Sequence, residues 1–298
     1  MEGALGERLK REYALSFDEN VAMARLVQSA EGRAALCALW TEYRAIAEEY
    51  GFPFLATTPT RRANRERMAR AGLDASLIRE NVRFLQEMRA SNGSEMYVGG
   101  LMGCRGDAYT GGDALNERDA KRLHAWQAEA FSEAGADYLF AGIMPTLPEA
   151  RGMARAMAET GLPYIISFTI RRDGCLIDGT NIDRAIGEVD GCAAYPPVCC
   201  MTNCVHPSIV REALEKPFNR TERVRTRFLG LQANTSPLDY DRLDGAKKLF
   251  SSPPEELAEE MLALHRTYPM RIFGGCCGTD GRHMREIAKR LCGGEEHL

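Results

Sequence analysis

Hydrophobic residues follow two patterns along the chain: short runs that are apolar throughout, and longer stretches with apolar positions every three or four residues. The short runs predict buried strands, and the longer stretches predict amphipathic helices. Seven strands are predicted, at residues 52–58, 96–101, 136–142, 163–169, 197–202, 227–232 and 270–273. Helices are predicted at 19–50, in two stretches of 61–90 separated near Gly72, and at 117–134, 148–160, 180–188, 208–215, 254–267 and 280–292.

Short apolar strands that alternate with helices indicate parallel pairing. We therefore predict an α/β fold, a (β/α)8 TIM barrel that forms a single domain over residues 1–298. Because such a barrel needs eight strands, the first strand is predicted to be short or truncated, at the very start of the chain. A doubly wound sheet would carry a glycine-rich phosphate turn after its first strand, and the segment 3–6 (Gly-Ala-Leu-Gly) matches it poorly. The longest loop is predicted at 233–252.

Composition and charge exclude some functional classes. The formal net charge is −4, so the chain lacks the excess of positive charge that is typical of nucleic-acid-binding proteins. No stretch approaches the roughly 20 apolar residues that span a bilayer, and no signal peptide is visible at the start. We therefore expect a cytoplasmic protein that binds neither nucleic acid nor membrane, and the sequence leaves a homo-oligomer open. The arginines gathered within residues 61–70 are interpreted as a solvated helix face.

The ten cysteines are expected to be reduced thiols, because the chain is long and lacks a secretion signal. Cys276 and Cys277 lie between glycines directly after the last predicted strand, and Cys204 follows the strand that ends near Met201. Counted with a short first strand, these are strands eight and six of the barrel. Active sites of such barrels lie at the carboxyl ends of the strands, so we expect the three thiols to lie close together.

Three thiolates without an obvious fourth protein ligand are typical of a zinc ion with an open position. We therefore predict that Cys204, Cys276 and Cys277 bind Zn2+. His206 is an open candidate for a fourth ligand. The following Pro207 favours instead a structural role for His206 at the start of a helix. A strained vicinal disulfide between Cys276 and Cys277 is the alternative. The cysteine pair 199–200 is a possible competing metal site. It lies within a strand, where successive side chains face opposite ways, so its two thiols cannot easily bind one metal ion.

The segment 274–279 (Gly-Gly-Cys-Cys-Gly-Thr), with the upstream pair Asn203 and Cys204, resembles the zinc-dependent homocysteine S-methyltransferase family. Residues 2–9 resemble the opening Asp-Gly-Ala-Met-Gly-Thr-Glu-Leu element of the family. Thr57, Thr58 and the residues up to 64 resemble its Thr-Thr-Asn-Thr-Phe element, and residues 135–145 resemble its fourth-strand element. The resemblance spans nearly the whole chain.

This resemblance implies a (β/α)8 barrel, a zinc ion held by the three cysteines, and methyl transfer to homocysteine from donors such as S-methylmethionine, betaine or methylfolate. The product would be methionine, which implies a role in methionine biosynthesis. We predict Glu2 as a catalytic residue. Substrate contacts are predicted from Glu2, Gly3, Thr57, Thr58, Asn203 and Asn234. For the two asparagines, support of a loop turn is an equal alternative.

The chain departs from the family in two places. Glu2 stands where the family has Asp, which keeps the carboxylate but lengthens the side chain by one methylene. Gly142 stands where the family has a Glu that holds the amino-acid end of homocysteine. Loss of such a charge-assisted contact costs about 1.5–3 kcal/mol. The acceptor is therefore either homocysteine bound differently or another thiol.

The sequence favours a methyltransferase whose partners are a small-molecule thiol and a methyl donor, with the thiol activated as a zinc thiolate. One alternative is a non-catalytic barrel that binds zinc or a thiol as a sensor or as a subunit of a larger methyl-transfer system. A zinc hydrolase is disfavoured, because three thiolates donate charge to the metal and weaken it as a Lewis acid.

Overall fold

Seven parallel strands form the centre of the protein, in a computed structural model that describes residues 1–91, 95–238 and 251–293. The strands are β1 (Phe54–Thr57), β2 (Met96–Gly103), β3 (Tyr138–Met144), β4 (Tyr164–Phe168), β5 (Cys199–Val205), β6 (Phe228–Ala233) and β7 (Ile272–Gly275). Each lies within a few residues of its predicted position. All seven predicted strands are therefore confirmed.

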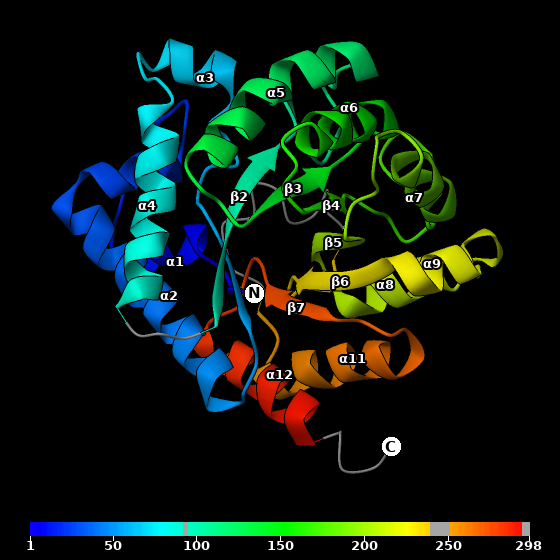
Figure 1. Ribbon diagram of the computed structural model, residues 1–298. Helices are drawn as coiled ribbons and strands as arrows, with labels where there is room; N and C mark the ends of the chain where they lie inside the picture. Colours follow the sequence, from blue (N-terminus) through cyan, green and yellow to red (C-terminus); the bar gives the residue numbers. More distant parts are fainter. Residues whose placement is uncertain (92–94, 239–250, 294–298) are drawn as a thin grey trace.

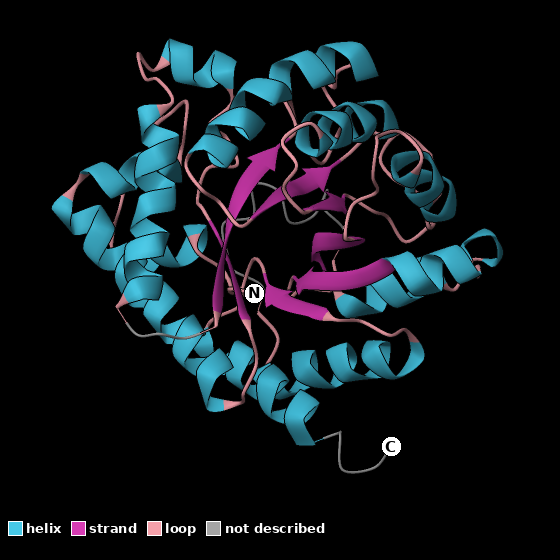
Figure 2. Cartoon of the chain, viewed as in Figure 1, coloured by secondary structure: helices cyan, strands magenta, loops and turns pink. Residues whose placement is uncertain are grey.

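The sheet has the sequential order β1-β2-β3-β4-β5-β6-β7, and every neighbouring pair is parallel. A doubly wound sheet would reverse its strand order at a switch point, and no reversal occurs among these strands. The sheet curls around its own axis, and helices cover its outer side (Figures 1 and 2). The predicted α/β barrel of the TIM type is confirmed.

The residues before β1 lie at the position where a barrel would have one more strand. The Met1 nitrogen donates to the Phe273 carbonyl at 2.6 Å, and the Gly275 N–H donates to the Glu2 carbonyl at 3.0 Å. The Glu2 carboxylate accepts from the Thr57 N–H at the end of β1. Residues 1–2 thus lie along β7 and contact β1, as expected of a very short first strand.

Helices occupy the outer layer. They are α1 (Gly6–Glu12), α2 (Ala30–Glu49), α3 (Arg65–Arg70), α4 (Ser76–Ala90), α5 (Glu117–Glu133), α6 (Leu147–Ala158), α7 (Ile182–Asp190), α8 (Pro207–Leu214), α9 (Glu222–Arg227), α11 (Pro254–Thr267) and α12 (Gly281–Gly293), with 3-10 helices η1 (Met23–Gln28) and η2 (Pro217–Asn219). Asn64, Asn116 and Asn181 start α3, α5 and α7 because their side chains accept an N–H from the first turn.

The helix predictions need correction in three places, and one loop prediction is only partly covered. The predicted helix at 19–50 is two elements, because Ser29 is extended and its side chain caps α2. Helices α1 and α9 were not predicted, since each has a single buried residue, Leu9 in α1 and Val224 in α9. The predicted 233–252 loop lies partly outside the described residues.

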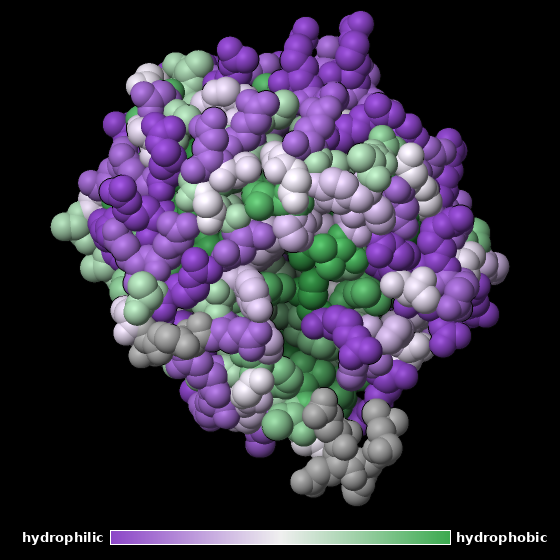
Figure 3. Space-filling view, viewed as in Figure 1, coloured by the Kyte–Doolittle hydropathy of each residue, from purple (hydrophilic) through white to green (hydrophobic). Residues whose placement is uncertain are grey.

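The core has two layers. A large cluster packs the helices against the outer face of the sheet, whereas a small one, composed of strand residues, fills the inside of the curl. The inner cluster contains Tyr138, Phe140, Ile165, Cys199 and Met201. On the face shown in Figure 3, hydrophobic residues gather in a central hollow and hydrophilic residues surround them. Among the described residues, no helix is both long enough and apolar enough to cross a membrane.

Candidate metal centre

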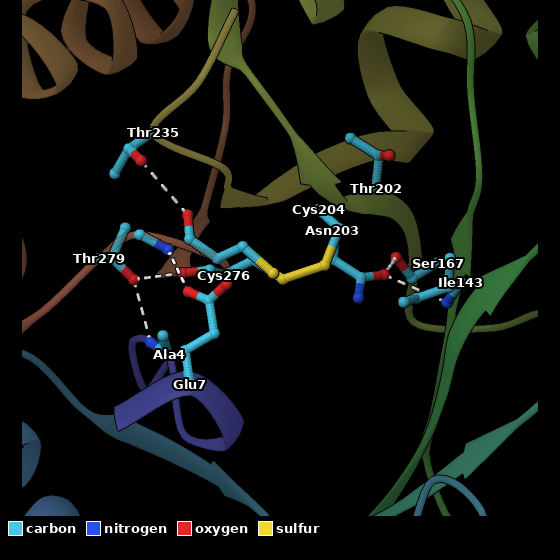
Figure 4. Close-up of a disulfide and its surroundings, with 12 residues drawn as sticks. Ala4, Glu7, Ile143, Ser167, Thr202, Asn203, Cys204, Thr235, Cys276 and Thr279 are labelled. Carbon is cyan, nitrogen blue, oxygen red and sulfur yellow. Dashed lines mark hydrogen bonds between the residues drawn. A yellow bond between two sulfur atoms is a disulfide. The ribbon is translucent and has the colours of Figure 1, made fainter. Parts of the chain in front are cut away.

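Cys204 lies in a bulge near the end of β5. The register between β5 and β6 shifts between Asn203 and Val205, so Cys204 is the extra residue. Its φ of 61° places it in the left-handed region, which costs a non-glycine residue about 1–3 kcal/mol. The bulge interrupts the alternation of the strand: the side chain of Cys204 is directed to Cys276, and that of Asn203 is directed to Ser167 and Ile143 (Figure 4).

Cys276 and Cys277 lie on a tight loop between β7 and α12. Thr279 shapes this loop: its hydroxyl donates to the Cys276 carbonyl at 2.7 Å and accepts from the Ala4 N–H at 3.0 Å. Gly275 is required there, because a Cβ at this residue would lie 2.3 Å from the Thr279 Oγ1. The Cys276 N–H donates to the Ala233 carbonyl and the Thr235 N–H donates to the Cys277 carbonyl, which ties the loop to β6.

The three sulfur atoms gather at one point, as the sequence predicts. The Sγ atoms of Cys204, Cys276 and Cys277 all lie within 4.8 Å of one another. Cys204 and Cys276 are joined as a disulfide that bridges the ends of β5 and β7 (Figure 4). The expectation that every cysteine is a reduced thiol is therefore wrong for this pair. The alternative vicinal disulfide is also wrong, because Cys277 is free.

The donor set suits a zinc ion once the disulfide is reduced. Zinc–sulfur bonds of about 2.3 Å at tetrahedral angles separate the sulfur atoms by about 3.8 Å, which is within the 4.8 Å spread of these three. Burial and the nearby Glu7 carboxylate raise the pKa of Cys277 to about 11. The Glu7 carboxylate also accepts from the Gly278 N–H at 2.8 Å, which fixes the residue after the cysteine pair.

Asn203 joins the bulge of β5 to a second bulge near the end of β3. Its Oδ1 accepts from the Ile143 N–H at 3.2 Å and from the Ser167 hydroxyl. Ile143 is in the left-handed region with a φ of 57°, and the β3–β4 register shifts between Ala141 and Met144. The side chain of Asn203 therefore supports the backbone, which is the structural role that the sequence left open for it.

Glu2 and Thr57 are brought together at the mouth. The buried Glu2 carboxylate accepts from both the N–H and the hydroxyl of Thr57. Burial raises the pKa of Glu2, and the hydrogen bonds from Thr57 oppose that rise. Gly3 is also buried, and a Cβ there would lie 2.8 Å from the ring of Tyr43.

Thr58 and Asn234 are buried near the same end of the barrel. The Thr58 hydroxyl accepts from the Leu101 N–H at 3.1 Å and bonds to the Thr60 hydroxyl, so it links β1 to β2. The Asn234 N–H donates to the Val205 carbonyl at 3.0 Å, directly after the β5 bulge. The predicted substrate contacts of Glu2, Gly3, Thr57, Thr58, Asn203 and Asn234 stay predictions.

His206 caps α8, and it does not belong to the cluster of potential metal ligands found among the described residues. Its Nδ1 accepts from the Ser208 N–H, and burial lowers the pKa of the ring to about 4. Cys199 lies in the inner cluster and Cys200 in the outer one, so these two thiols face opposite sides of the sheet. Among the described residues, the one cluster of potential metal ligands is the cysteine triad.

Gly142 is buried and leaves no carboxylate at the end of β3. A Cβ at this position would lie 2.9 Å from the Leu101 Cδ1 and 3.8 Å from the Phe140 Cε1, so neighbouring side chains fill the space. At this position the mouth therefore offers no carboxylate that could pair with an ammonium group.

Three residues that the sequence did not single out support the cysteine loop: Glu7, Thr235 and Thr279. Glu7 and Thr279 lie within residues 2–9 and 274–279, two of the segments that carry the family resemblance. Their place in these segments was the one sequence feature that could have identified them. Their contacts join residues more than 270 positions apart, such as the 2.8 Å bond between Glu7 and the Gly278 N–H. Such pairs cannot be derived from local spacing.

Comparison with known proteins identifies a family for this chain. The family model for homocysteine S-methyltransferase matches residues 1–291. The S-methylmethionine–homocysteine S-methyltransferase BHMT2 of Pongo abelii is 25% identical over 220 residues, which is 68% of this chain and 56% of that protein. The homocysteine S-methyltransferase YbgG of Bacillus subtilis is 26% identical over 194 residues, 61% of this chain and 56% of that protein. The chain thus spans about half the length of these curated relatives.

Solved structures show the same fold. The metallated form of the homocysteine methyltransferase MmuM from Escherichia coli superposes with a TM-score of 0.76 at 21% identity, covering 97% of this chain and 95% of that one. The oxidized form of the same protein superposes equally well, with a TM-score of 0.76.

Proposed function

Since the chain belongs to the homocysteine S-methyltransferase family, we propose that it is a zinc-dependent S-methyltransferase. Its default acceptor is homocysteine, which gives methionine. One observation carries the proposal: three cysteine sulfurs from the ends of β5 and β7 lie within 4.8 Å of one another at the barrel mouth. The curated relatives, whose names state methyl transfer to homocysteine, support the reaction class.

The residues of this chain fit the role of a zinc-holding centre. Cys204, Cys276 and Cys277 would hold the ion after reduction of the disulfide. A zinc ion held there by three thiolates would supply an open position that lowers the pKa of an acceptor thiol, so that the thiol would be a nucleophile at neutral pH. The loop contacts of Thr279 and Thr235 hold the backbone of the 276–277 pair.

The barrel mouth contributes orientation as well as ligands. The bulge at Cys204 directs its sulfur toward the other two, and Asn203 holds that bulge in place. Glu2 and Thr57 form a hydrogen-bonded pair. This pair lies beside the cysteine loop, because the Glu2 carbonyl accepts from the N–H of Gly275, the residue before Cys276. We propose that Glu2 positions the acceptor at this rim.

Metal content and turnover test the proposal together. The protein is reduced with a phosphine, loaded with zinc and measured for bound metal. We expect one zinc per chain, and loss of tight binding in Cys204→Ser, Cys276→Ser and Cys277→Ser. Cys37→Ser is the matched control, because Cys37 is an exposed free thiol.

Methyl transfer to homocysteine is then assayed with S-methylmethionine, betaine and methylfolate as donors. We expect zinc-dependent formation of methionine with at least one donor, and its loss in the three serine variants but not in Cys37→Ser. Zinc binding without transfer to any thiol would support the non-catalytic alternative. Full turnover by the metal-free chain would exclude the proposal.

A further inference from the structure

Two arginines are held on a rigid turn at the end of β1. The Ala63 N–H donates to the Thr60 carbonyl at 2.8 Å, so Arg61 and Arg62 are the central residues of a tight turn. Thr60 is buried, its hydroxyl donates to the Leu101 carbonyl at 2.8 Å, and its carbonyl also accepts from Gln127. The base of the turn is thus fixed from two sides.

The side chain of Arg61 lies across the end of β2. A Cβ at Gly103 would lie 2.6 Å from the Arg61 Cγ, so the absence of a side chain at Gly103 makes room for it. Gly103 faces the same side of β2 as Leu101, which packs against the inner cluster. Gly103 is also the register partner of Gly142 on β3. The side chain of Arg61 therefore lies on the inner side of the barrel rim beside Gly142, at the end of the barrel that carries the cysteine centre.

This positive charge has no acidic partner in the parts of the chain that the structure describes. Neither Arg61 nor Arg62 forms an ion pair or a side-chain hydrogen bond there, and the Arg67 guanidinium donates only to the Arg105 carbonyl, at 3.4 Å. The nearby Glu66 is paired with Arg105 at 3.0 Å. Burial and the neighbouring arginines lower the pKa of Arg67, which shows that these cations repel one another. A bound anion would relieve that repulsion.

The acidic groups at the mouth are already engaged. The Glu2 carboxylate accepts from Thr57, and the Glu7 carboxylate accepts from the Gly278 N–H. The Asp107 carboxylate accepts from the N–H groups of Tyr109 and Thr110 within its own turn. At Gly142 there is no side chain. The mouth therefore offers an unpaired cation and no unengaged carboxylate among these groups.

We propose that Arg61 selects the thiol acceptor by its carboxylate, so that the carboxylate rather than an ammonium group is the main recognition point of the acceptor. A guanidinium matches a carboxylate with two parallel N–H donors. The inference rests on the proposed function, because the acceptor sulfur is bound at the cysteine centre. The interpretation of residues 61–70 as a solvated helix face is thereby replaced for Arg61, which lies on the turn before α3.

Binding of three thiols to the cobalt-loaded, phosphine-reduced protein tests this. The thiols are homocysteine, 4-mercaptobutanoate, which lacks the amino group, and 3-aminopropanethiol, which lacks the carboxylate. Each forms a sulfur–cobalt bond and releases its proton to the buffer, and the charge-transfer absorption of that bond gives the affinity. We expect 4-mercaptobutanoate to bind about as tightly as homocysteine, and 3-aminopropanethiol about 10- to 100-fold more weakly.

The variants make the assignment specific. Arg61→Gln should abolish the preference for a carboxylate, weakening the two acidic thiols by about 10- to 100-fold and leaving 3-aminopropanethiol unchanged. Arg61→Lys should keep part of the preference, because it keeps the charge but loses the paired donors. Arg65→Gln is the matched control, since it removes an exposed arginine from the same segment and should change none of the affinities. Thermal unfolding confirms that each variant is folded.

The outcomes separate this inference from the proposed function. Failure of the three cysteines to bind cobalt would contradict the proposed centre itself. Cobalt binding with tight coordination of 3-aminopropanethiol, or with equal affinities in Arg61→Gln and the parent protein, would overturn the role of Arg61 and leave the centre intact. An equal loss in Arg65→Gln would show a general charge effect and would also overturn it.

Discussion

Replacement of Asn203 by alanine tests how the chain holds Cys204 in its bulge. The Oδ1 of Asn203 accepts the Ile143 N–H at 3.2 Å and the Ser167 hydroxyl, and all three residues are buried. The Ile143 N–H lies where the β3–β4 register shifts. In Asn203→Ala this N–H loses its acceptor, which costs about 1–3 kcal/mol, and loss of the hydroxyl bond adds about 0.5–1.5 kcal/mol.

We therefore expect the free energy of unfolding to fall by about 1.5–4.5 kcal/mol. Without Asn203, the left-handed conformations at Ile143 and Cys204 lose their support and should relax. The Cys204 sulfur would then leave the centre, and zinc affinity should fall by about 10- to 100-fold, as for residues that orient metal ligands. Zinc would consequently stabilise the variant by about 1.4–2.7 kcal/mol less than it stabilises the parent protein.

Urea denaturation of the reduced protein, with and without zinc, measures both quantities. Ser167→Ala is the control, because it removes the hydroxyl bond and leaves the bond from Ile143 to Asn203. It should cost no more than about 1.5 kcal/mol and should not change zinc affinity. If Asn203→Ala lost less than about 0.5 kcal/mol, or bound zinc as tightly as the parent protein, the reasoning about the bulge would be refuted.

Three further variants test other parts of the structure. Asp280→Asn should lower stability at pH 7 by at most about 1 kcal/mol. Burial opposes ionisation of Asp280, but hydrogen bonds from Arg282 and His283 lower its pKa to about 2, so the difference should disappear as pH falls from 4 through 2 in acid titrations of stability. Gly142→Glu should tighten binding of amino-bearing thiols about 10-fold in the cobalt titration, with displacement of the Leu101 side chain. Gly275→Ala should abolish tight zinc binding, because its Cβ would overlap Thr279, whose hydroxyl holds the loop.

Each of these three variant predictions has a control variant or a result that would contradict it. A constant difference between Asp280→Asn and the parent protein over the whole acid range would contradict the lowered pKa. Equal tightening of 4-mercaptobutanoate by Gly142→Glu would show that the new carboxylate does not contact an amino group. Gly191→Ala is the control for Gly275→Ala, since a Cβ there makes only an ordinary 3.5 Å contact. It should leave zinc affinity unchanged.

Local sequence patterns were sufficient to predict the strands and the grouping of the three cysteines. Each strand is a short apolar run bounded by polar or turn residues, and a parallel barrel places the strand ends on one rim. Cys204 could therefore be assigned to the same site as the pair 276–277 despite a separation of 72 residues. The direction of each sulfur could not be predicted, because the Cys204 bulge depends on contacts of Asn203 with Ile143 and Ser167.

The rest of the site depends on contacts between distant residues, which the spacing of residues along the sequence does not predict. Helix α1 shows a single buried position, so its periodicity was too weak to predict it. The disulfide depends on two bulged or looped backbones that meet only in the folded chain. Arg61 looked like one of several surface arginines, and its distinct position follows from the turn at Thr60 and the space above Gly103.

Because the candidate centre joins residues 2–7 to residues 275–279, its assembly must follow synthesis of residue 279. Glu2 and Ala4 bond to Gly275 and Thr279, and Glu7 bonds to Gly278. At a translation rate of about 5–20 residues per second, Glu7 waits roughly a quarter of a minute to a minute for its partner to be made. During that interval the nascent chain exposes an unpaired strand edge at β1. A chaperone or the ribosome surface would therefore encounter the barrel open on the side where the metal centre is later completed.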